Sequence, residues 1–296
     1  MSIVINTPTG NIGGRVVERL LTAGEDVTVI HRNPEKVRHL ADRGVRVIQG
    51  SLDDPAALDR ALEGAEALFW LTPPPFQPDF LAWAVDAARQ AAAAARTQGV
   101  QRVVVLSSTG AHNGPNPDPV GILLAVEDAF RSALANVTVL RPGYFMENLL
   151  HSAATLAQGA LYHVFPRDMA FPVVSTRDIG DRAAEALLDR AWTGHRLFGV
   201  HGPADLSHDE MVAVLSEELG HPVRYEEVTD EQLRQGMLES GLPPFLADLY
   251  TELYRRGREG YLVAAETRTV ETTTPITLRE FAREVLRPAI ERGAAA

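Results

Sequence analysis

The sequence of 296 residues contains no cysteine. Disulfide bonds, thiolate catalysis, and zinc or iron–sulfur sites with cysteine ligands are therefore excluded. Lysine is almost absent too, because Lys36 is its only occurrence and every other basic side chain is arginine or histidine. Any mechanism that needs a lysine must therefore use Lys36.

Long apolar segments and an excess of positive charge are also missing. No apolar run approaches the roughly 20 residues of a membrane-spanning helix, so we expect no membrane association. No basic segment precedes the first apolar residues, so we expect no signal peptide and a cytoplasmic location. The net charge of −11 argues against nonspecific nucleic-acid binding, which requires basic patches. The expected partner is a small-molecule substrate, and the acidic surface permits a homodimer without requiring one.

The most informative stretch lies at the start of the chain. The β-branched residues 3–5 predict a buried strand, and a turn rich in Thr, Pro and Gly follows. Residues 12–21 then carry apolar side chains at helical spacing. A strand, a glycine turn and a helix N-terminus together offer backbone N–H groups to an anion, as in a dinucleotide pyrophosphate site. We expect this site to use Thr7, Thr9, Gly10, Asn11, Ile12 and Gly13.

The first half of the chain alternates apolar strand patterns with helical patterns. The six predicted strands are residues 3–5, 27–31, 45–48, 65–71, 103–106 and 137–140. Their apolar runs are nearly continuous, which is typical of parallel strands covered on both faces by crossover helices. The predicted fold class is α/β, with a Rossmann-like doubly wound parallel sheet in residues 1–150.

The second half is less regular. Helical patterns at residues 147–158, 178–190, 209–219, 230–240 and 278–290 are separated by short strand candidates at 170–173 and 221–223. We expect residues 151–296 to form a smaller mixed α/β lobe that binds the substrate, with some later segments returning to the first domain.

The residue at the end of the second strand indicates whether the cofactor is NAD or NADP. An acidic residue there would bind the ribose 2′-hydroxyl of NAD, but this chain has Arg32. The planar guanidinium suits a 2′-phosphate, so we expect NADP (as NADPH) rather than NAD. The alternative is that Arg32 is an ordinary surface residue.

The other strand ends supply further candidates, because ligands bind beyond the carboxyl ends of parallel strands. For any one of them, an ordinary loop role is the alternative. The predicted contacts are Ser51 and Leu52 beside the adenine, Thr72 and Pro73 beside the ribose and nicotinamide, and Ser107 and Pro142 after the fifth and sixth strands.

Several motifs together resemble the NmrA-like family of atypical short-chain dehydrogenases/reductases. They are residues 9–13 (TGNIG), 31–36 (HRNPEK), 49–54 (QGSLDD), 141–148 (RPGYFMEN), 178–180 (DIG), 201–203 (HGP) and 277–281 (TLREF). The resemblance covers nearly the whole chain, and the RPGYFMEN run is its most specific part. It implies an NAD(P)-binding domain and a small C-terminal substrate domain. Family members include NAD(P)H-dependent quinone or azo-type reductases and non-catalytic redox-sensing regulators.

The chain departs from the pattern at the catalytic pair. Typical short-chain dehydrogenases use a Tyr-x-x-x-Lys pair, in which the lysine lowers the pKa of the tyrosine. Counting back from Glu127 places Val120 and Leu124 at these two positions. Ordinary ketone–alcohol chemistry is therefore not expected. Ser51 stands in place of the usual adenine-side aspartate, and Thr7 in place of a glycine.

Hydride transfer to a conjugated acceptor does not need the missing pair, because the resulting anion is stabilised and a weak acid can protonate it. We therefore predict an NADPH-dependent oxidoreductase that reduces a quinone-like molecule, with Tyr144, Ser108 and His112 as candidate catalytic groups. The aromatic residues that would line an apolar pocket, or else belong to the core, are Phe76, Trp83, Phe145, Phe165 and Phe171. The histidines lack metal-ligand spacing, so we propose no metal.

Two other interpretations stay open. The missing pair favours a dinucleotide-sensing regulatory protein without turnover. A biosynthetic enzyme that kept the fold and changed the reaction is the third interpretation.

Overall fold

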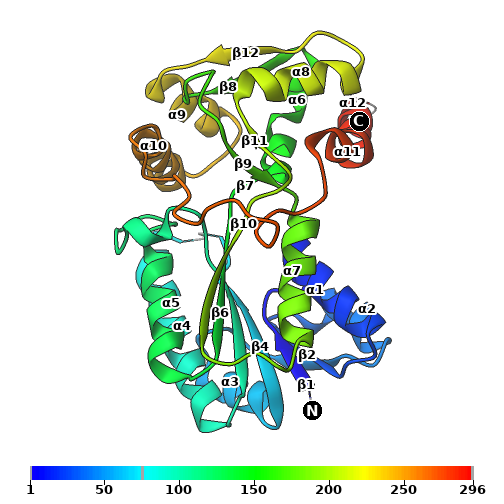
Figure 1. Cartoon of the computed structure of the whole chain (residues 1–296), viewed down its shortest axis with the longest axis vertical. Coiled ribbons are helices and arrows are strands. Elements are labelled where there is room, and N and C mark those ends of the chain that lie inside the picture. Colours follow the sequence, from blue (N-terminus) through cyan, green and yellow to red (C-terminus); the bar gives the residue numbers. More distant parts are fainter. Residues whose placement is uncertain (1, 75–76, 295–296) are drawn as a thin grey trace. The chain divides into compact units, whose positions relative to one another are not determined.

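The computed structural model describes residues 2–74 and 77–294 (Figure 1). The chain forms two compact units, one of Met1–Arg141 with Ile179–Phe198 and one of Pro142–Asp178 with Gly199–Ala296. The first crossing of the chain from the first unit to the second falls after Arg141, before the boundary at residue 150 that the sequence predicts. The reason is that the segment after this crossing, Tyr144–Phe145, pairs with the strand Phe171–Val174 in the second unit.

The first unit is built on one seven-stranded sheet. Its strands are β1 (Ser2–Ile5), β2 (Val27–His31), β3 (Arg46–Gln49), β4 (Ala65–Leu71), β5 (Arg102–Leu106), β6 (Val137–Pro142) and β10 (His195–Val200), in the order β10-β6-β5-β4-β1-β2-β3. The pairings are parallel, and Val4 lies opposite Thr28 of β2 and Leu68 of β4. This confirms the predicted doubly wound α/β fold. The strand order reverses beside β1, where such folds bind ligands.

Helices cover both faces of this sheet (Figure 1). They are α1 (Asn11–Thr22), η1 (Pro34–Val37), α2 (Arg38–Ala41), α3 (Pro55–Leu62), α4 (Phe80–Thr97), η2 (Ala111–Asn113), α5 (Ile122–Ala133) and α7 (Thr176–Leu188). The side chains of Asn33 and Asp54 cap η1 and α3 by accepting backbone N–H groups at the starts of these helices. In both helices a proline, whose nitrogen carries no hydrogen, occupies the first turn.

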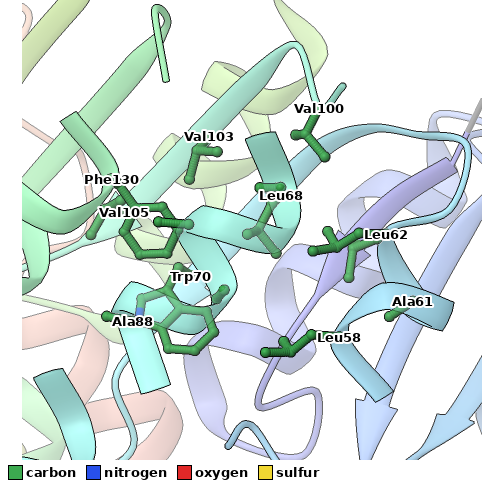
Figure 2. Close-up of a cluster of buried hydrophobic side chains, with 14 of the residues drawn as sticks. Leu58, Ala61, Leu62, Leu68, Trp70, Ala88, Val100, Val103, Val105 and Phe130 are labelled. Carbon is green, nitrogen blue, oxygen red and sulfur yellow. The ribbon is translucent and has the colours of Figure 1, made fainter. Parts of the chain in front are cut away.

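The core on the α3–α4–α5 face fixes the register of the strands. Trp70 of β4 packs against Phe130 of α5 with 5.5 Å between ring centroids, and Leu58 and Leu62 of α3 close the other side (Figure 2). All four side chains are almost fully buried. Each such burial stabilises the fold by roughly 1.5–3 kcal/mol, and a shift of β4 by one residue would turn Trp70 to the opposite face.

The second unit contains two small sheets and its own core. One sheet has the order β11-β9-β7, with β7 Tyr144–Phe145, β9 Phe171–Val174 and β11 Asp205–Leu206; the other pairs β8 (Ala160–His163) with β12 (Arg224–Glu227). The helices are η3 (Met146–Ser152), α6 (Ala153–Ala157), α8 (His208–Leu219), α9 (Asp230–Glu239), α10 (Pro244–Arg258), α11 (Leu278–Phe281), η4 (Ala282–Leu286) and α12 (Arg287–Ala294).

The structure corrects two details predicted for this unit. The strand expected at residues 221–223 begins only at Arg224, because Pro222 carries no N–H and the backbone N–H of Val223 donates to the Ser216 hydroxyl at 2.8 Å. The helix expected at 147–158 is a 3₁₀ segment followed by the short α6. Met146 and Leu149 of this segment are buried in the core of the second unit.

Candidate functional site

The turn after β1 is shaped to present backbone donors. Gly10 caps α1 without a side-chain hydrogen bond, and the first turn of α1 contains no acidic residue. The N–H groups of this turn and the positive end of the helix dipole are therefore not neutralised by a capping side chain or by an acidic residue of the first turn. Gly13 permits the tight approach of helix to turn, because a Cβ there would lie 2.2 Å from the carbonyl oxygen of Thr7. Such an arrangement binds phosphate groups.

A cavity of about 270 Å³ begins at this turn and follows the ends of the strands. It is lined by Thr7, Thr9 and Gly10 after β1, Ile30, His31 and Arg32 at β2, Gly50, Ser51 and Leu52 after β3, Pro73 and Pro74 after β4, and Trp83 of α4. Its volume lies just below the roughly 300–1,000 Å³ of sites for drug-sized molecules. It therefore has room for part of a dinucleotide rather than the whole.

Unpartnered polar atoms at the strand ends fit a polar ligand. Within the described part of the chain, the buried hydroxyl oxygens of Thr7 and Thr72 have no hydrogen-bond partner. Buried polar atoms are normally hydrogen-bonded, so an orphaned hydroxyl beside a cavity is a place for a ligand group. Thr7 also adopts φ +53°, a left-handed conformation that is uncommon for a β-branched residue.

A positive and a negative side chain lie just beyond the ends of β2 and β3. Arg32 is exposed at the end of β2, and the next residue, Asn33, donates its backbone N–H to Nδ1 of His31. A hydrogen bond from Ser51, together with one from Trp83 and the charge of Arg32, lowers the pKa of Asp53. Asp53 is therefore ionised at neutral pH, but it is not among the residues that line the cavity.

A buried charge network lies at the ends of β5 and β6. Glu127 of α5 is fully buried and accepts hydrogen bonds from Ser107 at 2.6 Å and from Nε and Nη2 of Arg141 at 2.9 and 2.8 Å. Arg131 adds an ion pair at 3.1 Å. The Ser107 hydroxyl hydrogen is thus committed to Glu127, which leaves only its lone pairs for a ligand. The sequence motifs did not predict this network, although one carboxylate among the apolar residues of a helix was its visible signal.

The predicted catalytic groups belong to different units of the chain. Ser108 and His112 belong to the first unit and do not line the cavity; His112 is exposed on η2, and the Ser108 hydroxyl donates to the carbonyl oxygen of Thr109. Tyr144 belongs to the second unit, where burial raises its pKa to about 12 despite a hydrogen bond with Asn148. A tyrosine of this kind keeps its proton at neutral pH, so it can donate a proton but not accept one.

The predicted cofactor contacts divide into three groups. Thr7, Thr9, Gly10, Arg32, Ser51, Leu52 and Pro73 line the cavity together. Asn11, Ile12 and Gly13 form the first turn of α1, and Thr72 precedes Pro73. Ser107 lies in the Glu127 network, and Pro142 begins the second unit.

The aromatic candidates have different surroundings. Trp83 lines the cavity, whereas Phe165 and Phe171 pack against each other in the second unit with 5.9 Å between centroids. Phe145 is partly buried in β7, and Phe76 lies outside the described residues. Across residues 2–74 and 77–294, no group of three or more His, Asp or Glu side chains could hold a metal ion. In the same ranges, no helix combines the length and the apolar character needed to cross a membrane.

In this chain, the two positions of the usual catalytic pair are occupied by Val120 and Leu124. Leu124 lies on α5, but this helix begins at Ile122, so Val120 precedes it. Neither side chain can exchange a proton.

A doubly wound sheet with a glycine turn and a cavity at its switch point defines a nucleotide-binding α/β protein. The chain belongs to the NmrA-like family, whose model matches residues 1–262. It is 34% identical to the NAD(P)H azoreductase of Xenophilus azovorans over 99% of this chain and 100% of that one. It is 32% identical to (4-alkanoyl-5-oxo-2,5-dihydrofuran-3-yl)methyl phosphate reductase of Streptomyces griseus, over 94% of this chain and 95% of that one.

A solved structure supports the fold. The triphenylmethane reductase of Citrobacter sp., determined as a complex with NADP(H), superposes with a TM-score of 0.83 at 23% identity, covering 96% of this chain and 99% of that one. The predicted family and fold class are thus both confirmed.

Proposed function

We propose that this chain is an NADPH-dependent oxidoreductase that transfers a hydride to a conjugated, quinone-like small molecule without a Tyr/Lys pair. The observation that carries the proposal is Arg32 in the wall of a cavity that starts at the glycine turn. Its guanidinium can form charge-assisted hydrogen bonds with a 2′-phosphate. The two sequence relatives are both named as reductases, which supports this interpretation.

Different residues would bind different parts of the cofactor. The turn at Thr7–Gly10 and the first turn of α1 would hold the pyrophosphate, and Arg32 the 2′-phosphate. Ser51 and Leu52 would lie beside the adenine. The residues proposed to contact the ribose and nicotinamide half of the cofactor are Thr72, Pro73, Ser107 and Pro142.

Hydride transfer to a conjugated acceptor requires little from the protein beyond the correct orientation of the cofactor and the acceptor. Bound NADPH supplies a hydride. A conjugated acceptor then carries a delocalised anion, which a weak acid can protonate. Tyr144 keeps its proton at neutral pH and is the leading donor, with Ser108 and His112 as the others. The second unit, by this proposal, binds the substrate.

The competing function is a dinucleotide-sensing regulatory protein without turnover. The observation that favours it is the replacement of the Tyr/Lys pair by Val120 and Leu124. An enzyme of the same fold with a changed biosynthetic reaction is a third possibility. All three predict cofactor binding. The regulatory protein differs from the two enzymes by its lack of turnover, and the two enzymes differ in the reaction that they catalyse.

Cofactor selectivity is tested by titrating NADPH and NADH into the wild type, Arg32→Ala and Arg38→Ala. Arg38 is the matched control, because its side chain is 73% exposed and lies outside the cavity. A charge-assisted hydrogen bond contributes about 1.5–3 kcal/mol, so Arg32→Ala should weaken NADPH binding about 10- to 100-fold and leave NADH binding unchanged. Equal affinities for the two cofactors, unaltered in Arg32→Ala, would refute the NADP assignment.

Turnover is tested by following NADPH oxidation with a panel of quinones and azo compounds. Oxidation that depends on the acceptor supports the reductase. Tight NADPH binding with no oxidation across the panel eliminates it and supports the regulator.

We also propose a cytoplasmic location and no nucleic-acid binding; the net charge of −11 supports the latter. A homodimer is compatible with this acidic surface. Analytical ultracentrifugation and a DNA gel-shift assay would test the two statements about association.

A further inference from the structure

His31, the last residue of β2, lies in the wall of the cavity beside Arg32. Successive residues of a strand point to opposite faces of the sheet, so two neighbours do not ordinarily face the same space. Here the strand ends at His31 and the chain bends at Arg32, and both residues line the cavity. The cavity wall at the end of β2 therefore contains an imidazole next to a guanidinium.

The turn after β2 holds one nitrogen of this imidazole. Nδ1 of His31 lies 2.6 Å from the backbone carbonyl oxygen of Asn33 and 3.1 Å from the backbone nitrogen of the same residue. The side chain of Asn33 accepts the N–H of Glu35 and so fixes this turn at the start of η1. Whichever of the two bonds Nδ1 makes, the turn uses it. Nε2 is therefore the ring nitrogen that is left for a ligand.

The protonated form of this ring suits a phosphate. Histidine is the side chain whose charge ordinarily changes between about pH 5 and pH 8. The protonated ring carries a hydrogen on both nitrogens, so Nδ1–H can donate to the carbonyl oxygen of Asn33 while Nε2–H donates to an anion. The distance of 2.6 Å between Nδ1 and that carbonyl oxygen suits the first of these bonds. An anion beside the ring favours the protonated form.

The other charges near this end of β2 have both signs. Arg46 of β3 lies opposite Thr28, at the other end of the strand, and β1 (Ser2–Ile5) has no titratable side chain. The charged side chains of α1 are paired with Asp181 and Arg43. Because neither sign prevails among the rest, the charge of a bound phosphate decides whether the ring is protonated. These remaining side chains are the basic Arg32, Lys36 and Arg60 and the acidic Glu35, Asp53, Asp54 and Asp59.

We propose that His31, held by Asn33, is a second ligand of the 2′-phosphate beside Arg32, and that binding of the cofactor is thereby coupled to the uptake of a proton. This inference rests on the proposed NADP binding. Because the phosphate stabilises the protonated ring, the affinity for a 2′-phosphorylated nucleotide should rise as the pH falls. A nucleotide without the 2′-phosphate should show no such coupling. The preference for NADPH over NADH should therefore increase toward mildly acidic pH.

The test compares adenosine 2′,5′-bisphosphate with adenosine 5′-monophosphate by isothermal titration calorimetry at pH 6.5 and pH 8.5, so no turnover is needed. Both pH values lie above the second pKa of a phosphate monoester, which is about 6. His31→Val removes both ring nitrogens. It should weaken binding of the bisphosphate about 10-fold at pH 6.5, as expected for the loss of a hydrogen bond to a charged group, and less than about threefold at pH 8.5. Binding of the monophosphate should stay near the wild-type value. His39→Gln, which replaces an exposed histidine of α2 outside the cavity, should change neither affinity.

A second variant separates the charge from the hydrogen bond. His31→Gln keeps an amide N–H donor near the position of Nε2, but this amide does not gain a proton near neutral pH. The ratio of its two affinities should therefore be nearly independent of pH. Titrations at pH 7 in two buffers of different ionisation enthalpy count the protons, and the wild type should take up more protons per bisphosphate than His31→Gln does. Circular dichroism checks that each variant is folded.

The possible failures can be told apart. If the wild type binds neither NADPH nor the bisphosphate, the proposed function itself fails. If both bind but His31→Val keeps the wild-type affinity and its pH dependence, or weakens the monophosphate equally, the role of His31 is refuted and cofactor binding stands.

Discussion

Glu127 and Arg141 form a doubly hydrogen-bonded ion pair inside the first unit, with N–O distances of 2.9 and 2.8 Å. Glu127 is fully buried and Arg141 is 5% exposed. Because Arg141 lies on β6 and Ser107 follows β5, the same carboxylate links the ends of two neighbouring strands at the edge where ligands are expected.

Breaking this pair should destabilise the fold severely. Glu127→Ala removes the carboxylate that pairs with the buried guanidinium of Arg141, and removing one partner of a buried ion pair costs about 3–5 kcal/mol. The free energy of unfolding from urea titration measures the loss. Asp86→Ala is the control, since its pair with Arg89 is about two-thirds exposed on both sides and should contribute less than about 1 kcal/mol. Similar unfolding midpoints for the two variants would contradict the assignment.

A substitution in the strained turn after β1 should instead raise the free energy of unfolding. A left-handed conformation costs a residue other than glycine roughly 1–2 kcal/mol, whereas introducing a glycine costs about 0.5–1 kcal/mol in conformational entropy. Thr7, at φ +53°, should therefore be replaced by glycine with a gain of up to about 1 kcal/mol in the free energy of unfolding. Thr9 has no positive φ, so Thr9→Gly should be neutral or destabilising. Thermal unfolding of both variants provides the measurement, and destabilisation by Thr7→Gly alone would show that the turn is not strained.

Most of the strands that the sequence predicted in the first unit are almost continuously buried; β3, in which only Ile48 is buried, is the exception. Residues 27–31 and 103–106 are apolar throughout or nearly so, and they lie inside the sheet. β10 (His195–Val200) was missed because it lies at the edge of the sheet and begins with exposed or half-buried polar residues. In β12 only Tyr225 is buried, so its sequence carries almost no strand pattern.

The site was predictable where it depends on strand ends and unpredictable where it depends on tertiary contacts. Arg32, Ser51 and Leu52 follow from the rule that ligands lie beyond the carboxyl ends of parallel strands. The contact between Trp83 and Asp53 depends on how α4 packs beside the end of β3, which no local pattern encodes. Helix α10 (Pro244–Arg258) was likewise missed.

Two glycines in helices should respond to alanine in opposite ways. Alanine normally stabilises a helix by about 1 kcal/mol relative to glycine. At Gly180 a Cβ would lie 2.7 Å from the Cβ of Arg15 and 3.2 Å from the carbonyl oxygen of Ile12, in the first turns of α1. Overpacking costs about 1–3 kcal/mol, so Gly180→Ala should be destabilising overall.

Gly236 on α9 is the matched control, because a Cβ added there would meet no atom within 4 Å and the residue is exposed. Gly236→Ala should therefore raise the free energy of unfolding by about 1 kcal/mol. If cofactor binding depends on the start of α1, Gly180→Ala should also weaken NADPH binding, whereas Gly236→Ala should not. A stabilising effect of Gly180→Ala would refute the close packing of α7 on α1.

Two buried histidines should make the second unit sensitive to mild acid. His163 and His208 stack with 5.2 Å between ring centroids. Burial, with the nearby His208 and Arg258, lowers the pKa of His163 to about 3, and burial lowers that of His208 to about 4. In the unfolded chain both should titrate near a pKa of about 6.5. Between these values the unfolded state binds more protons than the folded state.

The free energy of unfolding should therefore fall as the pH drops below about 6.5, because the depressed pKa values keep both rings neutral in the folded state. Below about pH 6 each histidine contributes a slope that approaches 1.4 kcal/mol per pH unit. Urea unfolding between pH 7 and pH 5 measures this slope. His163→Phe, which keeps an aromatic ring beside Phe165 and Tyr254, should remove about half of it, whereas His39→Gln, at an exposed position of α2, should leave it unchanged. An identical slope in the wild type and in His163→Phe would mean that other groups govern the acid sensitivity.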